Sequence, residues 1–172
     1  MIDAAVEVRA ARSPDDLAAV RELLRAFVRW HRSEHREDRA LVDAYFDPTS
    51  FETELAGLPG PYAEPSGRLL LARRAGAPAG CVALQRIDDQ TCEMKRMFVP
   101  SELHGLGVGR RLGRAIVDGA RSAGYRVMRL DTSWRQSAAI GLYRSLGFVP
   151  TEPDPSLPAE LRSWLRFFEL RL

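Results

Sequence analysis

The chain has 172 residues, of which 45% are hydrophobic and 28% charged, and its formal net charge is +2. This length and composition predict one folded domain, residues 1–172, and exclude disordered and collagen-like chains. The near balance of charge argues against nucleic acid as a partner. Charged residues such as Glu7 and Arg9 interrupt the N-terminus, and no apolar run is long enough to span a bilayer. We therefore expect no membrane partner and a cytoplasmic location.

The first third of the chain predicts one strand followed by helices. Residues 5–12 alternate apolar and polar side chains, as a strand does. The stretch SPDD that follows is typical of a helix start, and apolar residues then recur at helical spacing to about His31. Residues 41–55 predict a second helix, broken or offset by Pro48. The loop 57–67 carries prolines among glycines, so we expect no regular structure there.

The rest of the chain predicts strands interrupted by two helices. Residues 68–74, 79–87 and 91–99 have the pattern of a three-stranded antiparallel meander. After it we expect a helix ending near Gly124, a strand at 126–132, a short helix at 136–146 and a last strand at 166–172. Strands and helices do not alternate regularly, so we predict an α/β (α+β) fold in which helices cover a mixed, mostly antiparallel sheet.

The two cysteines predict no disulfide. A hairpin turn near Asp88 would place Cys92 opposite about Gln85, and therefore too far from Cys81 for a sulfur bridge. We expect two reduced thiols that act as small buried apolar groups.

The three histidines predict no metal site. His31 and His35 are spaced to share one face of a helix, where a third ligand would be needed to hold zinc. Acids and arginines surround this pair, which favours a solvated helix end. His104 lies far away in the sequence, so we expect no metal.

The stretch HGLGVGRRLGRAI, residues 104–116, places glycines at every second position where a helix begins. Unpaired N–H groups and the helix dipole make such a start suitable for binding phosphate, although a plain turn or close helix packing would explain the glycines equally well. The loop lacks the lysine and hydroxyl residue of a Walker motif. It also lacks the dinucleotide-binding fingerprint, because its glycines are evenly spaced and the strand before it belongs to an antiparallel meander.

Two motifs in this half of the chain resemble the GCN5-related N-acetyltransferases. That family's first signature is Gln or Arg, two residues, Gly, one residue, and Gly or Ala, and here His104, Gly107 and Gly109 occupy these places. The family's later segment is matched with Gln136 in place of the usual Asn. The matched residues of that segment are Gln136, Ala139, Ile140, Leu142, Tyr143, Gly147 and Phe148.

The resemblance implies that the chain transfers an acetyl group from acetyl-CoA to a primary amine of a small molecule or peptide. In the family, the strands that correspond to 97–99 and 129–132 splay apart and admit the cosubstrate. The edge of the first strand would bind the pantetheine amides as an added strand would. Backbone N–H groups of the glycine loop would hold the pyrophosphate. The implied binding residues are Met97, Phe98, Val99, His104, Gly105, Leu106, Gly107, Val108, Gly109 and Arg110.

The resemblance also implies two catalytic residues. Glu93 precedes the cosubstrate edge and corresponds to an acid that serves as a base through water in several family members. An ion pair with Lys95 or Arg96, or simple solvation, is the alternative reading of this carboxylate. Tyr143 matches a tyrosine whose hydroxyl protonates the departing sulfur, and its alternative is an aromatic ring packed on the sheet. We expect direct transfer in a ternary complex.

The acceptor site should be built from the N-terminal helices, the loop 57–67 and the segment 151–164. Arg96, Tyr62, Trp134 and Trp164 are candidates for contact with the acceptor. The unusual His104 and Gln136 leave one alternative function, a catalytically weak acyl-CoA sensor or interaction module. The sequence also leaves a homodimer open.

Overall fold

A computed structural model of the chain describes residues 5–172, and a seven-stranded sheet runs through it. The strand order is β1-β2-β3-β4-β5-β7-β6, and within the described residues β4 and β5 form the only parallel pair. The strands are β1 (Val6–Ala10), β2 (Arg68–Arg74), β3 (Ala77–Arg86), β4 (Thr91–Phe98), β5 (Val127–Ser133), β6 (Val149–Pro150) and β7 (Leu165–Arg171). The predicted mixed, mostly antiparallel sheet is therefore confirmed.

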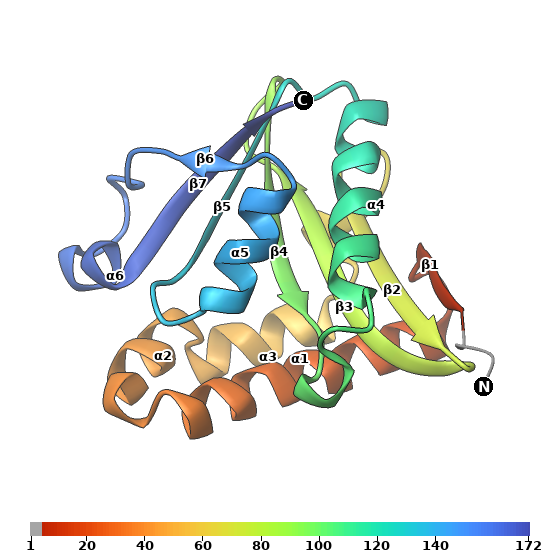
Figure 1. Ribbon diagram of the computed structural model, residues 1–172, viewed down its shortest axis with the longest axis horizontal. Helices are drawn as coiled ribbons and strands as arrows, with labels where there is room; N and C mark the ends of the chain where they lie inside the picture. Colours follow the sequence, from red (N-terminus) through yellow and green to blue (C-terminus); the bar gives the residue numbers. More distant parts are fainter. Residues whose placement is uncertain (1–4) are drawn as a thin grey trace.

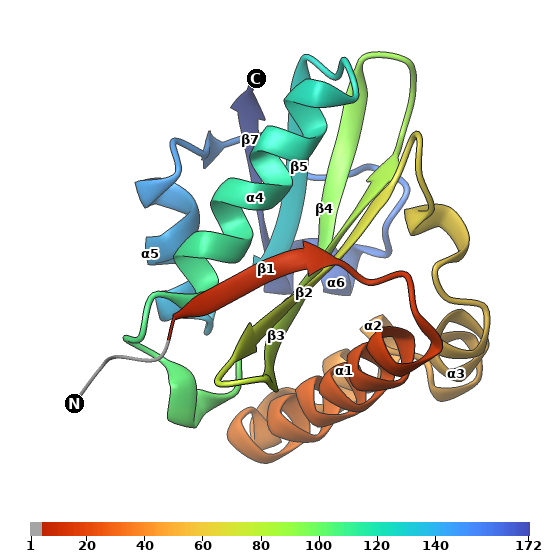
Figure 2. The same cartoon turned by 90° about the vertical axis from the view of Figure 1, so that its right-hand side faces the viewer.

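Helices cover both faces of this sheet (Figure 1). The helices are α1 (Pro14–Glu34), α2 (Arg39–Tyr45), α3 (Pro48–Ala56), α4 (Val108–Ser122), α5 (Ser137–Ser145) and α6 (Ala159–Trp164). Figure 2 shows α4 and α5 on one face and α1, α2 and α3 on the other. Each face has its own apolar core: Leu112 and Ile116 of α4 pack in one, and Val20 and Leu24 of α1 in the other. The sheet thus lies between two apolar cores.

The two cysteines lie in different cores. Cys81 packs with the α1 core and Cys92 with the α4 core, so the sheet lies between their side chains. Both are free, and burial raises the pKa of each thiol to about 12. The prediction of two reduced thiols is confirmed. Cys92 lies opposite Arg86, one residue away from the Gln85 that the sequence indicated.

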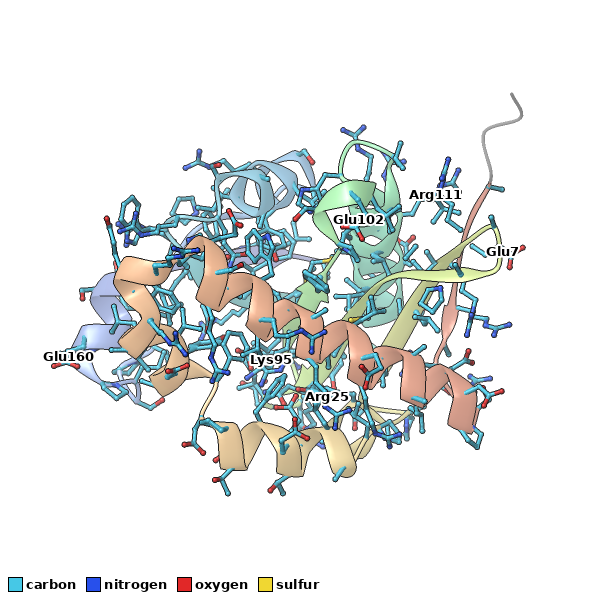
Figure 3. The ribbon with its side chains drawn as sticks, turned by 90° about the horizontal axis from the view of Figure 1, so that it is seen from below. Glu7, Arg25, Lys95, Glu102, Arg111 and Glu160 are labelled. Atoms are coloured by element: carbon cyan, nitrogen blue, oxygen red, sulfur yellow. The ribbon has the colours of Figure 1, made fainter. Side chains whose placement is uncertain are left out.

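The N-terminal helices begin where their capping residues are. The Ser13 hydroxyl accepts a hydrogen bond from the Asp16 N–H at 3.1 Å, and α1 then runs to Glu34, beyond the expected His31. The expected break at Pro48 is confirmed as a boundary between two helices. Asp47 caps α3 by accepting from the Ser50 N–H at 2.9 Å. In Figure 3, seen from below, α1 and α3 run beside each other, and Arg25 of α1 pairs with Glu52 of α3 at 2.9 Å.

Two elements fall outside the predicted order of strands and helices. The short strand β6 follows α5, and the helix α6 lies within the segment 151–164, and the sequence predicted neither element. The loop 57–67 contains only one 3₁₀ turn, Gly60–Tyr62. Within residues 5–172, no helix has both the length and the apolar character needed to cross a membrane.

Candidate active site

The parallel strands β4 and β5 pair for only three residues and then diverge. Their last pair is Glu93 with Arg129, although β4 continues to Phe98 and β5 to Ser133. A bulge in β4 accompanies the divergence: its register with β3 shifts, and Arg96 adopts a left-handed φ of 57°. Beyond Glu93 the edge of β4 that faces β5 therefore has no strand partner among the described residues, and the predicted splay is present.

The glycine loop before α4 presents free backbone donors. Gly105 and Gly107 have φ angles of 81° and 78°, a conformation that glycine adopts without strain. The His104 and Leu106 N–H groups donate to the carbonyls of Ser101 and Leu103, just before the loop, at 3.1 and 3.4 Å. Within the described chain, the N–H groups of Gly105 and of residues 107–110 have no acceptor. Five donors at the start of a fifteen-residue helix thus remain available to an anion.

His104 and Gly109 have structural tasks in this loop. The His104 ring bonds through Nε2 to the Val99 carbonyl at 2.8 Å, which ties the loop to the end of β4. A Cβ at Gly109 would lie 3.2 Å from the Leu142 side chain, and one at Gly113 only 2.5 Å from Leu146. These two glycines let α4 approach α5 closely. Close helix packing, the alternative explanation of the glycines, is therefore correct for Gly109. The Gly109 N–H still has no acceptor among the described residues.

A cavity lies in the opening between the diverging strands. It is reached by side chains from both cores, because Tyr143 belongs to the α4 core while Phe46 and Trp164 belong to the α1 core. The cavity thus connects the α5 side of the sheet with the side covered by α1 and α2. Its polar lining residues are His31, Tyr45, Lys95, Arg96, Asp131, Thr132, Ser133, Gln136 and Tyr143.

Tyr143 lines this cavity from α5. Its ring is buried and meets Phe148 edge to face, with centroids 6.0 Å apart. Burial raises the pKa of its hydroxyl above the ordinary value, and the negative charge of Asp131 raises it further. Among the described residues no hydrogen-bond partner is found for this hydroxyl. Tyr143 therefore stays protonated at neutral pH and has a proton to donate into the cavity.

Glu93 lies at the closed end of the splay and does not line the cavity. It accepts a hydrogen bond from the Gln85 amide at 2.7 Å, and the Lys95 ammonium lies 4.0 Å away. The ion pair with Lys95 considered from the sequence is thus present. The pair with Arg96 is absent, because Arg96 binds another carboxylate.

That carboxylate is Glu54 of α3, which the sequence analysis did not single out. Arg96 donates to both of its oxygens, at 2.9 and 2.6 Å, and the Tyr62 hydroxyl donates to it at 2.6 Å. Burial disfavours the charged form of Glu54, but the hydrogen bonds and charge of Arg96 outweigh burial and lower its pKa. The Arg96 side chain is 9% exposed, so this is a nearly buried ion pair that joins α3 to the bulge of β4.

A second pair that the sequence analysis missed lies across the cavity. The Tyr45 hydroxyl of α2 donates to Asp131 Oδ1 of β5 at 2.6 Å. Burial raises the pKa of Asp131, although the hydrogen bond from Tyr45 opposes this by favouring the carboxylate. Burial likewise raises the pKa of Tyr45 well above its usual value. Asp131 is separated from Tyr45 by 86 positions in sequence, so no local pattern could indicate the pair.

His31 corrects the expectation of a solvated helix end. It is 1% exposed, and its Nε2 accepts from the Gln136 amide at 2.9 Å. Its pKa is lowered to about 3, chiefly by burial, so the ring is neutral. Gln136, which replaces the expected Asn, thus reaches from the start of α5 to α1. No group of three metal-ligating side chains is found in the described part of the chain.

The two tryptophans proposed for acceptor contact differ in place. Trp164 is buried, lines the cavity and donates its indole N–H to Asp38 at 2.9 Å. Trp134 is 47% exposed and lies outside the cavity lining, with the Arg135 guanidinium 4.5 Å from its ring centroid. Of the four candidates, Arg96 and Trp164 line the cavity. Tyr62 does not line it, and its hydroxyl donates to Glu54, the partner of Arg96.

Comparison with known proteins places the chain in a family. Residues 19–148 match the model of the acetyltransferase (GNAT) family. An IAA acetyltransferase of Azospirillum brasilense is 40% identical over 69% of this chain and 79% of its own. The N-acetylaspartate synthetase of Danio rerio is 36% identical over 77% of this chain, which spans about half (49%) of that relative.

The fold also matches solved structures. The PaiA N-acetyltransferase of Thermoplasma acidophilum, solved in complex with coenzyme A, superposes with a TM-score of 0.71 over 98% of this chain and 99% of its own, at 17% identity. Because the family model covers most of the chain and a relative is 40% identical over most of its length, the chain belongs to the GNAT family of acetyltransferases.

Proposed function

We propose that the protein transfers the acetyl group of acetyl-CoA to a primary amine. The observation that carries the proposal is the meeting of three features: the free N–H groups before α4, the unpaired edge of β4, and the cavity between β4 and β5. The Azospirillum brasilense relative is named as an acetyltransferase, and the Thermoplasma acidophilum protein was solved with coenzyme A.

The residues of the loop and of β4 fit acetyl-CoA. The free N–H groups of Gly105 and of residues 107–110 would bind the pyrophosphate, where the α4 dipole adds to the attraction. His104 and Leu106 would shape the loop, since their N–H groups are already used. The edge at Met97–Val99 would receive the pantetheine amides as an added strand would. These contacts direct the thioester toward the cavity that Tyr143 lines.

The proton balance of the reaction assigns roles to the side chains. An ammonium nitrogen loses two protons as it becomes an amide nitrogen, and the thioester sulfur gains one as the C–S bond breaks. Tyr143 would supply the sulfur's proton, because burial keeps its hydroxyl protonated until a thiolate is present. Glu93 would accept a nitrogen proton through water from its place at the closed end of the splay.

Transfer would be direct, in a ternary complex with the amine. A covalent route needs a reactive thiolate, and the two cysteines do not provide one. Both are buried, the pKa of each is raised to about 12, and neither lines the cavity. The nitrogen lone pair would therefore attack the thioester carbonyl carbon itself.

Binding and thiol release test this proposal in sequence. Acetyl-CoA and CoA should each raise the melting temperature, and free thiol should appear when amines of a panel are added to protein with acetyl-CoA. No stabilisation by either compound would overturn the proposal. Stabilisation without thiol release from any amine would favour the acyl-CoA sensor instead.

The Tyr143→Phe variant tests the acid. We expect kcat to fall about 100-fold or more while the affinity for acetyl-CoA is kept. Tyr125→Phe is the matched control, since Tyr125 is also buried but its hydroxyl donates to the Ser66 carbonyl, away from the cavity. Unchanged turnover in Tyr143→Phe would end the role of Tyr143 as the acid.

A further inference from the structure

We propose that Asp131 is a further catalytic residue, which binds the ammonium group of the acceptor and takes its first proton, and that Tyr45 positions it. This inference rests on the proposed acetyl transfer and concerns the same cavity. It assigns the two nitrogen protons to two different carboxylates, Asp131 and Glu93.

Asp131 lies where the strands have separated. The last β4–β5 pair is Glu93 with Arg129, and Asp131 is two positions further along β5, as Lys95 is along β4. Asp131 lines the cavity, whereas Glu93 does not. An amine in the cavity therefore meets Asp131 directly, and it reaches Glu93 only through an intervening water.

Asp131 has one oxygen fixed and one available. Tyr45 donates to Oδ1 at 2.6 Å, and no donor to Oδ2 is found among the described residues. The nearby cations are engaged elsewhere: Arg96 with Glu54 at 2.6 Å and Lys95 with Glu93 at 4.0 Å. A partly buried carboxylate without a cationic partner is costly, and an ammonium ligand would supply that partner.

The walls of the cavity suit the same ligand. Aromatic rings of Phe27, Tyr45, Phe46 and Trp164 line it on the α1 side. A carboxylate beside aromatic faces attracts a cation both by its charge and through the ring quadrupoles. The ammonium is held at Asp131, and the rest of the acceptor lies toward the aromatic wall.

The step conserves atoms and charge. The ammonium N–H bond breaks, its proton goes to Asp131 Oδ2, and its electron pair stays on nitrogen as the nucleophilic lone pair. That pair forms the C–N bond, the C–S electrons leave on sulfur, and Tyr143 protonates the sulfur. The second nitrogen proton leaves through water to Glu93. Of the two protons that the carboxylates have taken, one returns to the Tyr143 oxygen and the other is released to solvent.

The groups that face Asp131 set how this step responds to pH. They are Glu93, Lys95 and Arg96 from β4, Tyr45 from α2, Tyr143 from α5 and neutral His31 from α1. Burial raises the pKa of Asp131, which brings the carboxyl closer to the range where a base works at neutral pH. The hydrogen bond from Tyr45 favours the ionised form, so removing it should raise this pKa further.

The experiment compares Asp131→Asn with Asp43→Asn, which removes a carboxylate of α2 that pairs with Arg32 at 2.7 Å outside the cavity. We expect Asp131→Asn to lower kcat/KM for the amine about 100-fold or more and to leave acetyl-CoA stabilisation unchanged. Asp43→Asn should behave as wild type. Wild-type activity and an unchanged pH profile in Asp131→Asn would overturn the inference and leave acetyl transfer itself standing.

Two readouts separate catalysis from a structural role. With an amine so weakly basic that it is neutral at the assay pH, the loss in Asp131→Asn should shrink to about tenfold or less, because no first proton must leave. The loss in Glu93→Gln should be equal for both amines.

Tyr45→Phe, which keeps Asp131, should move the acid limb of the pH–kcat/KM profile to higher pH. An equal loss for both amines in Asp131→Asn, together with an unmoved limb in Tyr45→Phe, would contradict the inference even if Asp131→Asn folds poorly.

Discussion

In the proposed function, the glycine loop before α4 and the cavity between β4 and β5 are two halves of one site, and they are built in opposite ways. The loop is one contiguous stretch, residues 104–110, and it offers backbone N–H groups. The cavity gathers side chains from α1, α2, β4, β5, α5 and α6, and it offers the Asp131 carboxylate, hydroxyls and aromatic rings. Backbone N–H groups can bind a cosubstrate that a whole family shares, because they do not depend on side-chain identity. The specificity for an acceptor depends on side chains.

The two regions also differ in what holds them together. The loop is held by its left-handed glycines, by the hydrogen bonds of the His104 and Leu106 N–H groups, and by the bond from the His104 ring to Val99. The cavity buries polar groups, and several of them have a partner from another element, as Glu54 is for Arg96 and Gln136 for His31. Changes on the cavity side should therefore cost more stability than changes in the loop.

The largest effect is expected at the nearly buried ion pair. Arg96→Met leaves Glu54 with only the Tyr62 hydroxyl in an apolar setting. We expect it to lower the free energy of unfolding by about 3–5 kcal/mol, because an uncompensated charge stays buried. Urea denaturation followed by circular dichroism measures this loss.

Two comparisons test the reason for that loss. Arg121→Met breaks an exposed pair with Asp118 on α4 and should cost about 0.5 kcal/mol or less. Adding Glu54→Leu to Arg96→Met should restore much of the lost stability, since both charges are then absent. If the double variant is no more stable than the single one, the unpaired charge is not the cause.

The next effect concerns His31, whose pKa in the folded protein is lowered to about 3. The unfolded chain binds a proton near the ordinary pKa of about 6.5, so stability is present above that pH and is lost as pH falls below it. Between pH 6.5 and 5 the free energy of unfolding should decrease by about 2 kcal/mol, a window above the titration of most carboxyls.

Variants at the two helix histidines check this dependence. His31→Gln should remove most of the slope of stability against pH, whatever its absolute stability. His35→Gln should remove less, because the pKa of His35 is also lowered by burial but its ring is only half-buried. An unchanged slope in His31→Gln would assign the pH dependence to other groups.

The same contrast explains what could be predicted from the sequence. The glycine loop and Tyr143 lie in contiguous motifs, and the strands show local alternation, so the sequence indicates them directly. The splay and the place of Tyr143 at the cosubstrate follow from the family that these motifs resemble. Asp131 meets Tyr45, and Glu54 meets Arg96, only because the fold places distant segments side by side. The helix α6 was missed because six residues between a proline-rich segment and the strand β7 give too few helical repeats to be detected.

The smallest effect is expected in the loop itself, at Gly107. An alanine there would meet no neighbouring atom, so its cost comes from the φ of 78° and should be about 1 kcal/mol. To relieve that strain the peptide must turn, which misaligns the free N–H groups, and we expect acetyl-CoA to bind about tenfold more weakly. Gly124→Ala is the matched control: Gly124 has a φ of 88°, also has nothing within 4 Å, and follows the opposite end of α4. It should lose similar stability and keep its affinity for acetyl-CoA by calorimetry. If both variants bind acetyl-CoA as the wild type does, the anion is not held by this loop, and the division between a backbone half and a side-chain half of the site fails.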